Sequence, residues 1–475
     1  SKALMEKGKN GKVYNTFLDI LSYEISEEKK KKLNLILKEI EEPTEKIIIE
    51  KPKLGEPTVL ILNSFKEESA KISVNDFVAY FKIRYDALRK ILQGRQELQN
   101  TISINRLTNK QGREPISIIG LVYDKNITKN GNILLTIEDP TGYIKVLVNK
   151  NREDLFNLAK DISVDEVIGI NGVNGNNIIF SNNLFYPDVL SSNGNKKSED
   201  EVYAAFISDL HIGSNMFLGK EFSKFIRWIN GNTGNLAHKR LAKKVKYLFI
   251  IGDLIDGVGV YPDQEKELVI KDIYQQYNAC AELLSQIRKD IKIIICPGNH
   301  DALRLSIPQP PLDKDFAKSL WDLPNVVMVS NPALINILSS ENFSGFNVLV
   351  YHGYGFHYYI DNVDSLRLNN ARDNPNLIVK YLLQRRHLAP SHSSTLYIPK
   401  TTQDPLVIDK VPDILACGEL HRTDVSNYNG VLIINCSCWQ AKTDFQEKTG
   451  NNPDPAKVPL LNLKTRVTKV LNFGG

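Results

Sequence analysis

In the second half of this chain, short apolar runs repeatedly end in motifs rich in Asp, His and Asn. Five such runs occur, at residues 202–207, 247–251, 291–296, 348–351 and 414–417. Their length and composition are typical of strands buried on both faces, and helical stretches lie at residues 222–230, 265–288 and 376–386. The alternation predicts an α/β layered domain.

The polar motifs follow the apolar runs directly. They are Asp209-x-His211, Gly252-Asp253, Gly298-Asn299-His300-Asp301, His352-Gly353 and Gly418-Glu419-x-His421. In such sheets ligands bind beyond the carboxyl ends of the strands, so the motifs are expected to converge. In each x-spaced pair we expect an extended segment that turns both side chains to one side, because alternate residues of a strand share a face.

Each motif alone has an ordinary structural explanation. An Asp-x-His pair also occurs in exposed loops, and an Asp after a strand also caps helices. Five motifs in one order, each at a strand exit, are hard to explain by structural roles. The set combines carboxylate, imidazole and amide oxygen and lacks thiolates, which disfavours structural zinc and suits manganese, iron or catalytic zinc.

Ahead of this domain the sequence changes to short strands joined by polar turns. The five candidates are residues 116–123, 132–138, 143–148, 166–173 and 177–180, with a helical piece near 152–160. They predict a small all-β barrel of the oligonucleotide-binding (OB) type, preceded by a helix over residues 74–98. Such a barrel either holds single-stranded nucleic acid or serves as a docking scaffold, and the sequence leaves both roles open.

A chain of 475 residues is too long for one ordinary core. We divide it into a charged N-terminal extension or tether (1–73), the helix and barrel (74–190), a linker (191–201) and the α/β domain (202–475). The extension contains a potential amphipathic helix after residue 26 and a lysine run at 29–32, which is typical of a solvated face.

Composition narrows the setting of the protein but not its substrate. The five cysteines include no C-x-x-C pair, and a strand with Cys436 and Cys438 in alternation places one of them in the core. The sequence shows neither a membrane span nor a signal-peptide pattern, so a cytoplasmic location is expected. The net charge of +5 permits nucleic-acid binding without demanding it. The basic run 238–246 is interpreted as a solvated helix face or a phosphate contact.

Four aromatic residues near the motifs could stack on a terminal base, although core packing explains each of them equally well: Tyr261, Phe356, Tyr358 and Trp439.

The order of the five motifs resembles the calcineurin-like metallophosphoesterase superfamily, over about 270 residues. Further stretches resemble the small subunits of archaeal family D DNA polymerase. These are residues 207–214 (ISDLHIGS), 252–262 (GDLIDGVGVYP), 307–310 (IPQP), 385–390 (RRHLAP) and 438–443 (CWQAKT). The barrel ahead of the phosphoesterase domain also matches that family, whereas the first 70 residues lend no such support.

The resemblance implies a site of two divalent metal ions, with manganese expected and iron, zinc or magnesium as alternatives. One ion would be held by Asp209, His211, Asp253 and His421, and the second by Asp253, Asn299, His352 and Glu419. His300 would face the scissile phosphate, with Asp301 orienting its ring. One departure stands out, because the superfamily usually has histidine where this chain has Glu419.

The resemblance further implies a proofreading 3′-to-5′ exonuclease subunit of a replicative DNA polymerase, which hydrolyses DNA phosphodiesters by a two-metal mechanism. Its partners would be the large catalytic polymerase subunit, the primer end of DNA and a nearby sliding clamp, in the archaeal cytoplasm at the nucleoid. Two alternatives remain open. One is a catalytically weak or inactive scaffold subunit, and the other is a phosphoesterase acting on another phosphate ester.

Overall fold

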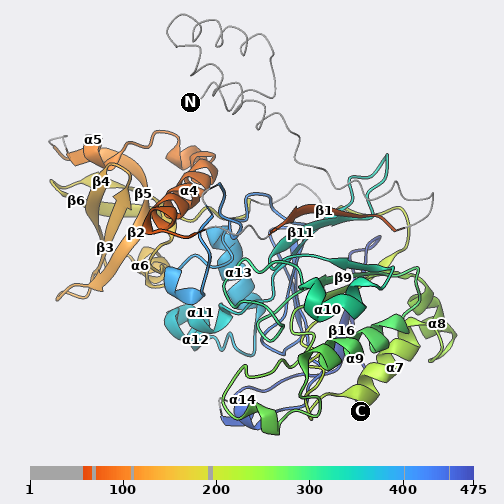
Figure 1. The fold of residues 1–475 in the computed structure, drawn as a ribbon. Helices are drawn as coiled ribbons and strands as arrows, with labels where there is room; N and C mark the ends of the chain where they lie inside the picture. Colours follow the sequence, from red (N-terminus) through yellow and green to blue (C-terminus); the bar gives the residue numbers. More distant parts are fainter. Residues whose placement is uncertain are drawn as a thin grey trace, which may run out of the picture. The chain divides into compact units, whose positions relative to one another are not determined.

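The computed structural model describes residues 57–66, 71–108, 112–190, 196–400, 402–448 and 450–474 (Figure 1). The helix expected after residue 26 and the lysine run at 29–32 lie outside these ranges. The described residues belong to one compact unit. None of the helices in these ranges is long and apolar enough to cross a membrane.

Five strands close the predicted barrel in the order β2-β3-β4-β6-β5. They are β2 (Pro115–Ile127), β3 (Ile133–Asp139), β4 (Gly142–Val148), β5 (Val167–Asn174) and β6 (Ile178–Phe185), with helix α6 (Glu153–Lys160) between β4 and β5. Alternate residues such as Ile118, Leu135 and Val146 fill its core. The helix predicted before the barrel is α4 (Val74–Gln93), followed by the short helices η1 (Gln96–Leu98) and α5 (Ile104–Thr108).

Two six-stranded sheets make up the larger part of the chain. The first has the order β10-β9-β8-β7-β16-β17, with β7 (Tyr203–Ile207), β8 (Val245–Ile251), β9 (Lys292–Cys296), β10 (Val326–Met328), β16 (Lys457–Asn462) and β17 (Thr468–Asn472). Strands β7 to β10 run parallel. The carboxyl ends of these strands therefore lie along one edge of the sheet.

The second sheet has the order β1-β11-β12-β13-β15-β14. Its strands are β1 (Val59–Ser64), β11 (Ala333–Ile337), β12 (Phe346–Val350), β13 (Ile414–Cys417), β14 (Asp424–Tyr428) and β15 (Val431–Asn435). Strands β12, β13 and β15 run parallel. The mixed α/β architecture with a separate closed barrel agrees with the predicted fold class.

Three apolar cores hold the sheets and helices together. One joins residues of both sheets, including Phe206 and Phe249 of the first and Val348 and Ile434 of the second. Another packs the first sheet against α7 (Gly219–Ile229), α8 (Leu236–Lys243), α9 (Ile273–Ser285) and α10 (Lys314–Trp321). The third packs the second sheet against α11 (Phe356–Asn362), α12 (Asp364–Leu368) and α13 (Asn376–Arg385). The short elements η2 (Gln264–Lys266), η3 (His392–Ser394) and α14 (Asp444–Lys448) lie in connecting segments.

The structure corrects the interpretation of residues 59–64, which the sequence assigns to an extension. They form β1, which pairs antiparallel with β11 at the edge of the second sheet. The short run VLIL offered too little periodicity to separate a strand from a tether, and only its partner strand, almost 270 residues later, reveals its role. The predicted helix 265–288 also proves shorter, because α9 begins after Asp272, whose side chain caps it.

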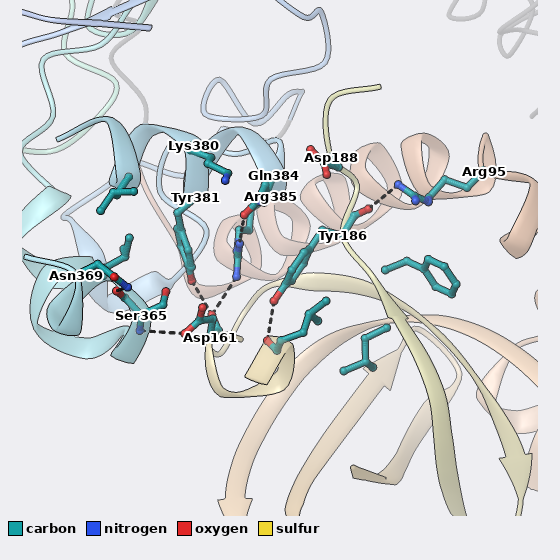
Figure 2. A pocket seen from close by; sticks show the side chains of 15 residues that line it. Arg95, Asp161, Tyr186, Asp188, Ser365, Asn369, Lys380, Tyr381, Gln384 and Arg385 are labelled. Atoms are coloured by element: carbon teal, nitrogen blue, oxygen red, sulfur yellow. Dashed lines mark hydrogen bonds between the residues drawn. The ribbon is translucent and has the colours of Figure 1, made fainter. Parts of the chain in front are cut away.

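Two buried groups of polar side chains join the barrel region to the sheet region. In the first, Arg385 of α13 pairs with Glu166 at 3.2 Å, and its guanidinium lies between the rings of Tyr186 and Tyr381. Figure 2 shows Arg385, Tyr186 and Tyr381 among the side chains that line a cavity, whose volume is about 450 Å³. In the second, Arg84 of α4 pairs with Asp404 at 2.8 Å. The run Arg385-Arg386-His387, which carries part of the family resemblance, thus serves this junction.

Candidate metal centre

The residues that the sequence proposed as ligands come together at the ends of five strands from both sheets. Asp209 and His211 follow β7, Asp253 follows β8, and Asn299 follows β9. His352 follows β12, and Glu419 with His421 follows β13. Six of the seven side chains form two groups in which the potential ligand atoms lie close together. The seventh, Asn299, has its amide oxygen buried.

The first group consists of Asp209, His211 and His421. The Nε2 atoms of the two histidines are 3.2 Å apart, and His421 Nε2 is also 3.2 Å from Asp209 Oδ1. His211 Nε2 lies 3.9 Å from the same carboxylate oxygen. Ligand atoms about 2.1 Å from one ion are separated by roughly 3 to 4 Å, so the three atoms fit around a single cation.

The second group is centred on His352. Its Nε2 atom lies 3.3 Å from Asp253 Oδ2 and 3.1 Å from Glu419 Oε2. Asp209 Oδ1 is 4.0 Å away, and Asp253 Oδ2 is also 4.0 Å from His211 Nε2. Asp209 and Asp253 therefore face both groups, which is the position required of a carboxylate shared between two neighbouring ions.

Several atoms of this cluster are buried without a hydrogen-bond partner. They are Asp209 Oδ1, Asn299 Oδ1, His352 Nε2 and Glu419 Oε2. A buried polar atom left unpaired costs about 1–3 kcal/mol, so four at one place call for a compensating group. All four are lone-pair atoms, and His352 Nε2 faces both Asp209 Oδ1 and Glu419 Oε2, at 4.0 and 3.1 Å, so divalent cations suit this set.

The imidazoles are oriented by hydrogen bonds at their other nitrogens. His352 Nδ1 donates to the carbonyl of Ile251 at 2.8 Å, and His211 Nδ1 meets Asp256 Oδ1 at 3.1 Å. A ring that donates from Nδ1 presents the lone pair of Nε2, which is the arrangement found in metal-bound histidines. In both residues Nε2 is the atom that faces the carboxylates.

The backbone at the ligands differs from the extended segments expected from the sequence. Asp209, His211, Asp253, Glu419 and His421 all have positive φ, between 51° and 69°. Such left-handed conformations are unfavourable for residues with a Cβ and persist where the surroundings enforce them. The paired side chains converge because of these turns and not because they alternate on a strand.

At two positions directly before a ligand, any residue larger than glycine would clash with a ligand side chain. A Cβ on Gly298 would lie 2.1 Å from Asp253 Oδ1, and one on Gly252, where φ is +80°, would lie 2.3 Å from His352 Nδ1. Both distances are shorter than any real Cβ contact. The Gly-Asp and Gly-Asn pairs in the sequence thus reflect close packing of backbone against ligand side chains.

Asp301 does not orient the ring of His300 as the resemblance implies. His300 Nδ1 contacts the carbonyl of Asp256 at 2.8 Å, so that carbonyl orients the ring. Asp301 instead accepts hydrogen bonds from the backbone of Gly298 and from Tyr277, at 2.9 and 3.3 Å. Asp301 thereby fixes the turn that carries the 298–301 motif, and burial beside Asp253 raises its pKa to about 7.

The charges within the cluster shift the pKa values of its own side chains. Burial by itself lowers the pKa of His352, but Asp253, Glu419 and Asp209 outweigh it and hold the pKa well above its usual value. Burial by itself raises the pKa of Glu419, but the facing imidazoles of His352 and His357, 3.1 and 3.4 Å away, lower it. Without cations the carboxylates therefore favour the protonated form of His352. Bound divalent ions would neutralise the carboxylates instead.

Several residues that support the ligands were not predicted from the sequence. Asp256 bonds to His211 and accepts from Gln440 and Gln264, each at 3.0 Å. Its oxygens are thereby occupied, so we assign Asp256 an orienting role although it lies close enough to His211 and His300 to form a third group. Its signal in the sequence was the second Asp of GDLIDG. His357 reaches Glu419 at 3.4 Å across the fold, and no local pattern announces it.

Other residues singled out in the sequence have structural positions. Phe356 and Trp439 are fully buried, whereas Tyr261 and Tyr358 remain partly exposed. All five cysteines are buried and free, including both Cys436 and Cys438. The basic run 238–246 covers most of α8, whose side chains are largely exposed.

Comparison with known proteins agrees with this architecture. Residues 204–425 match the family of B subunits of DNA polymerases alpha and epsilon. The DNA polymerase II small subunit of Methanothermobacter thermautotrophicus is 39% identical over 84% of this chain and 80% of its own length. That of Archaeoglobus fulgidus is 38% identical over 86% of this chain and 79% of its own length. For the small subunit of Pyrococcus abyssi the identity is 38%, over 64% of its length.

One solved structure, described as a novel archaeal phosphodiesterase, aligns with 57% of this chain and 99% of its own, at 12% identity. Its TM-score of 0.28 is too low to bear on fold or function.

Two sheets with a carboxylate, imidazole and amide cluster at their strand ends define the class of protein, a mixed α/β domain with residues suited to divalent metal ions, preceded by a small closed barrel. Within this class, the identity over most of the length of the relatives is decisive. The chain belongs to the family of archaeal DNA polymerase II small subunits, the small subunits of family D DNA polymerase.

Proposed function

We propose that this chain is the proofreading 3′-to-5′ exonuclease subunit of a replicative DNA polymerase and binds the large polymerase subunit. The observation that supports the exonuclease activity most directly is the set of buried, unpaired ligand atoms at the strand ends. A chain that served only as a scaffold would gain nothing from keeping such atoms unpaired, and apolar side chains would stabilise it better.

Two divalent cations would be held by the residues of the two groups. Asp209, His211, Asp253 and His421 would hold one, and Asp253, Asn299, His352 and Glu419 the other. When bound, such ions activate a water molecule and stabilise the charge of an attacked phosphodiester. The absence of thiolates and the three carboxylates favour manganese, with iron, zinc and magnesium as alternatives.

The chain's own residues position the substrate and the proton transfers. The Asp256 carbonyl fixes His300 Nδ1, and the backbone N–H of His300 donates to Asp253 Oδ1 at 2.8 Å. This pair of bonds holds the opposite edge of the ring, with Nε2, for the phosphate or the leaving oxygen. The charges of Asp253 and Asp256 outweigh burial and raise the pKa of His300, which favours the imidazolium form that a phosphate attracts.

Glu419 would act as a ligand in place of the superfamily's histidine. Its Oε2 atom faces His352, and its Oε1 atom is held by His357. A carboxylate in this position adds a negative charge, which strengthens cation binding and softens the Lewis acidity of the ion.

The proposal extends to partners through the family. The large catalytic subunit would bind this chain, a primer end of DNA would reach the metal centre, and a sliding clamp would be nearby. We also propose that the barrel is of the OB type. We propose that the chain divides into an extension, a barrel region, a linker and a phosphoesterase domain, and that β1 belongs to the phosphoesterase domain.

The test is a nuclease assay with the whole chain and manganese on single-stranded and 3′-mismatched DNA. We expect nucleotides to be released from the 3′ end and His300→Ala to lower the rate by about 100-fold or more, as for loss of a positioned acid or base. Elemental analysis should find the same metal content in the variant. No release of nucleotides with any divalent metal would establish the scaffold alternative.

A further inference from the structure

A groove of about 690 Å³ opens beside the metal centre. It is lined by Phe77 of α4, by Tyr354, His357 and Tyr358 at α11, and by residues 392–397. Because His357 Nε2 also lies 3.4 Å from Glu419 Oε1, this one side chain belongs to both the groove and the centre.

The lining of the groove is aromatic and carries no carboxylate, lysine or arginine among its described residues. Rings of Phe77, Tyr358 and Tyr397 and the 60%-exposed side chain of Leu396 supply flat apolar surface. Hydroxyls at residues 393–395 supply hydrogen-bond donors and acceptors. Such walls do not attract a phosphate, but they suit a neutral, flat group with a polar edge.

The walls are held in place independently of any ligand. The Tyr397 ring stacks on Tyr80 with centroids 5.1 Å apart, and the backbone N–H of His392 donates to Asp165 Oδ2 at 2.8 Å. Leu396 and Ile398 exchange backbone hydrogen bonds with Ile307, each at 2.9 Å. The groove is therefore a preformed surface supported from both the barrel region and the sheets, and its partly exposed rings need no induced fit to bind a base.

We propose that this groove binds the unpaired terminal nucleobases of a DNA strand whose phosphodiester lies at the metal centre. The proposal rests on the exonuclease function above and adds the subsite that recognises a frayed end. A base held in Watson–Crick pairing has its faces stacked in the duplex and cannot enter, whereas a mismatched end exposes them. The groove thus favours mismatched over paired termini without reading sequence, because every base has a π-face.

The experiment measures binding in EDTA, so that it does not depend on catalysis. Fluorescence anisotropy compares a short single-stranded oligonucleotide with one whose terminal residues are abasic. The full chain should bind the base-containing end at least about fivefold more tightly, the lower end of what one base–aromatic stack contributes. Phe77→Ala and Tyr358→Ala should bring that ratio close to one, while affinity for the abasic strand stays unchanged.

Tyr274→Ala is the matched control, because Tyr274 is a 48%-exposed aromatic residue on α9 outside the groove. It should keep the full ratio, and circular dichroism should show all three variants folded. Equal binding of both oligonucleotides by the unmodified chain, or a ratio insensitive to the groove variants, would overturn the proposal. A base preference that the variants abolish, in a chain that releases no nucleotides with any metal, would instead retain the groove and reject the nuclease.

Discussion

Two buried clusters of charged side chains differ in how many of their polar atoms have hydrogen-bond partners. In the junction cluster, which consists of Tyr80, Arg84, His387 and Asp404, the Asp404 carboxylate accepts from all three partners at 2.6 to 2.9 Å. Arg84 also donates to the carbonyl of Pro390 at 2.8 Å. In the metal centre, by contrast, four lone-pair atoms have no hydrogen-bond partner.

This difference separates a structural cluster from a functional one better than burial or charge does. Both clusters are largely buried, both contain histidine and aspartate, and both shift pKa values strongly. Of these two clusters, the metal centre is the one that leaves acceptors without donors and holds most of its ligands in left-handed backbone conformations. An excess of buried lone pairs predicts a cation, whereas a balanced set predicts a joint between parts of the fold.

The strongest test of the comparison is Arg84→Met. The substitution keeps the volume but leaves Asp404 buried without its cation, which should lower the free energy of unfolding by about 3–5 kcal/mol. Denaturant unfolding monitored by circular dichroism measures the change. Arg89→Met, an exposed position on the same helix, should have almost no effect, and added manganese should not rescue the Arg84 variant. Unchanged stability of Arg84→Met would mean that the junction cluster does not hold the fold together.

Asp253→Asn, unlike Arg84→Met, should lower the nuclease activity more than the stability of the fold. Its carboxylate faces both groups, so removal of its charge should lower the nuclease rate at least about 100-fold, beyond the usual loss from an outer partner of a ligand. In EDTA its melting temperature should change much less than that of Arg84→Met. Asp272→Asn, which replaces one good helix cap with another, serves as control. Full activity in Asp253→Asn would show that Asp253 is not a ligand of the metal centre.

Manganese should stabilise the chain through the metal centre alone. An ion at ten times its dissociation constant adds about 1.4 kcal/mol per site, which corresponds to a rise of a few degrees in melting temperature. Differential scanning calorimetry with manganese and with EDTA measures this shift, and Asp253→Asn should largely abolish it. A shift of the same size in that variant would place the binding elsewhere.

The smallest expected effect is the response of the junction cluster to acid. His387 Nδ1 accepts from the backbone of Ala389 while Nε2 donates to Asp404, so protonation would cost a hydrogen bond. Burial and the charge of Arg84 lower the pKa of His387 to about 4, whereas the unfolded chain has a value of about 6.5. Between these values only the unfolded state takes up the proton, so stability falls as the pH falls.

From pH 7.5 to pH 5.5 this linkage should remove about 1.4 kcal/mol of stability. His387→Gln, which can still donate to Asp404, should lose that much less than the unmodified chain over the same range. Urea unfolding at the two pH values gives the difference. Parallel pH dependence in both proteins would show that His387 is protonated in the folded state as readily as in the unfolded one.

The amino-acid sequence by itself determined the parts of this protein that depend on local pattern. The apolar runs of strand length, the alternating barrel strands and the polar residues at strand exits all follow from periodicity and turn chemistry. The set of ligand types also follows, because Asp, His, Asn and Glu offer the lone pairs that a divalent cation needs. The motifs predicted which residues would meet.

The tertiary structure alone decided how those residues meet. The supporting contacts of Asp256 with Gln440 and of Glu419 with His357 join segments far apart in the chain, which no local pattern encodes. The left-handed turns at the ligands and the role of Asp301 as a support for its own turn depend on packing against neighbouring strands. The same holds for β1, whose identity as a strand comes from the edge it pairs with and not from its six residues.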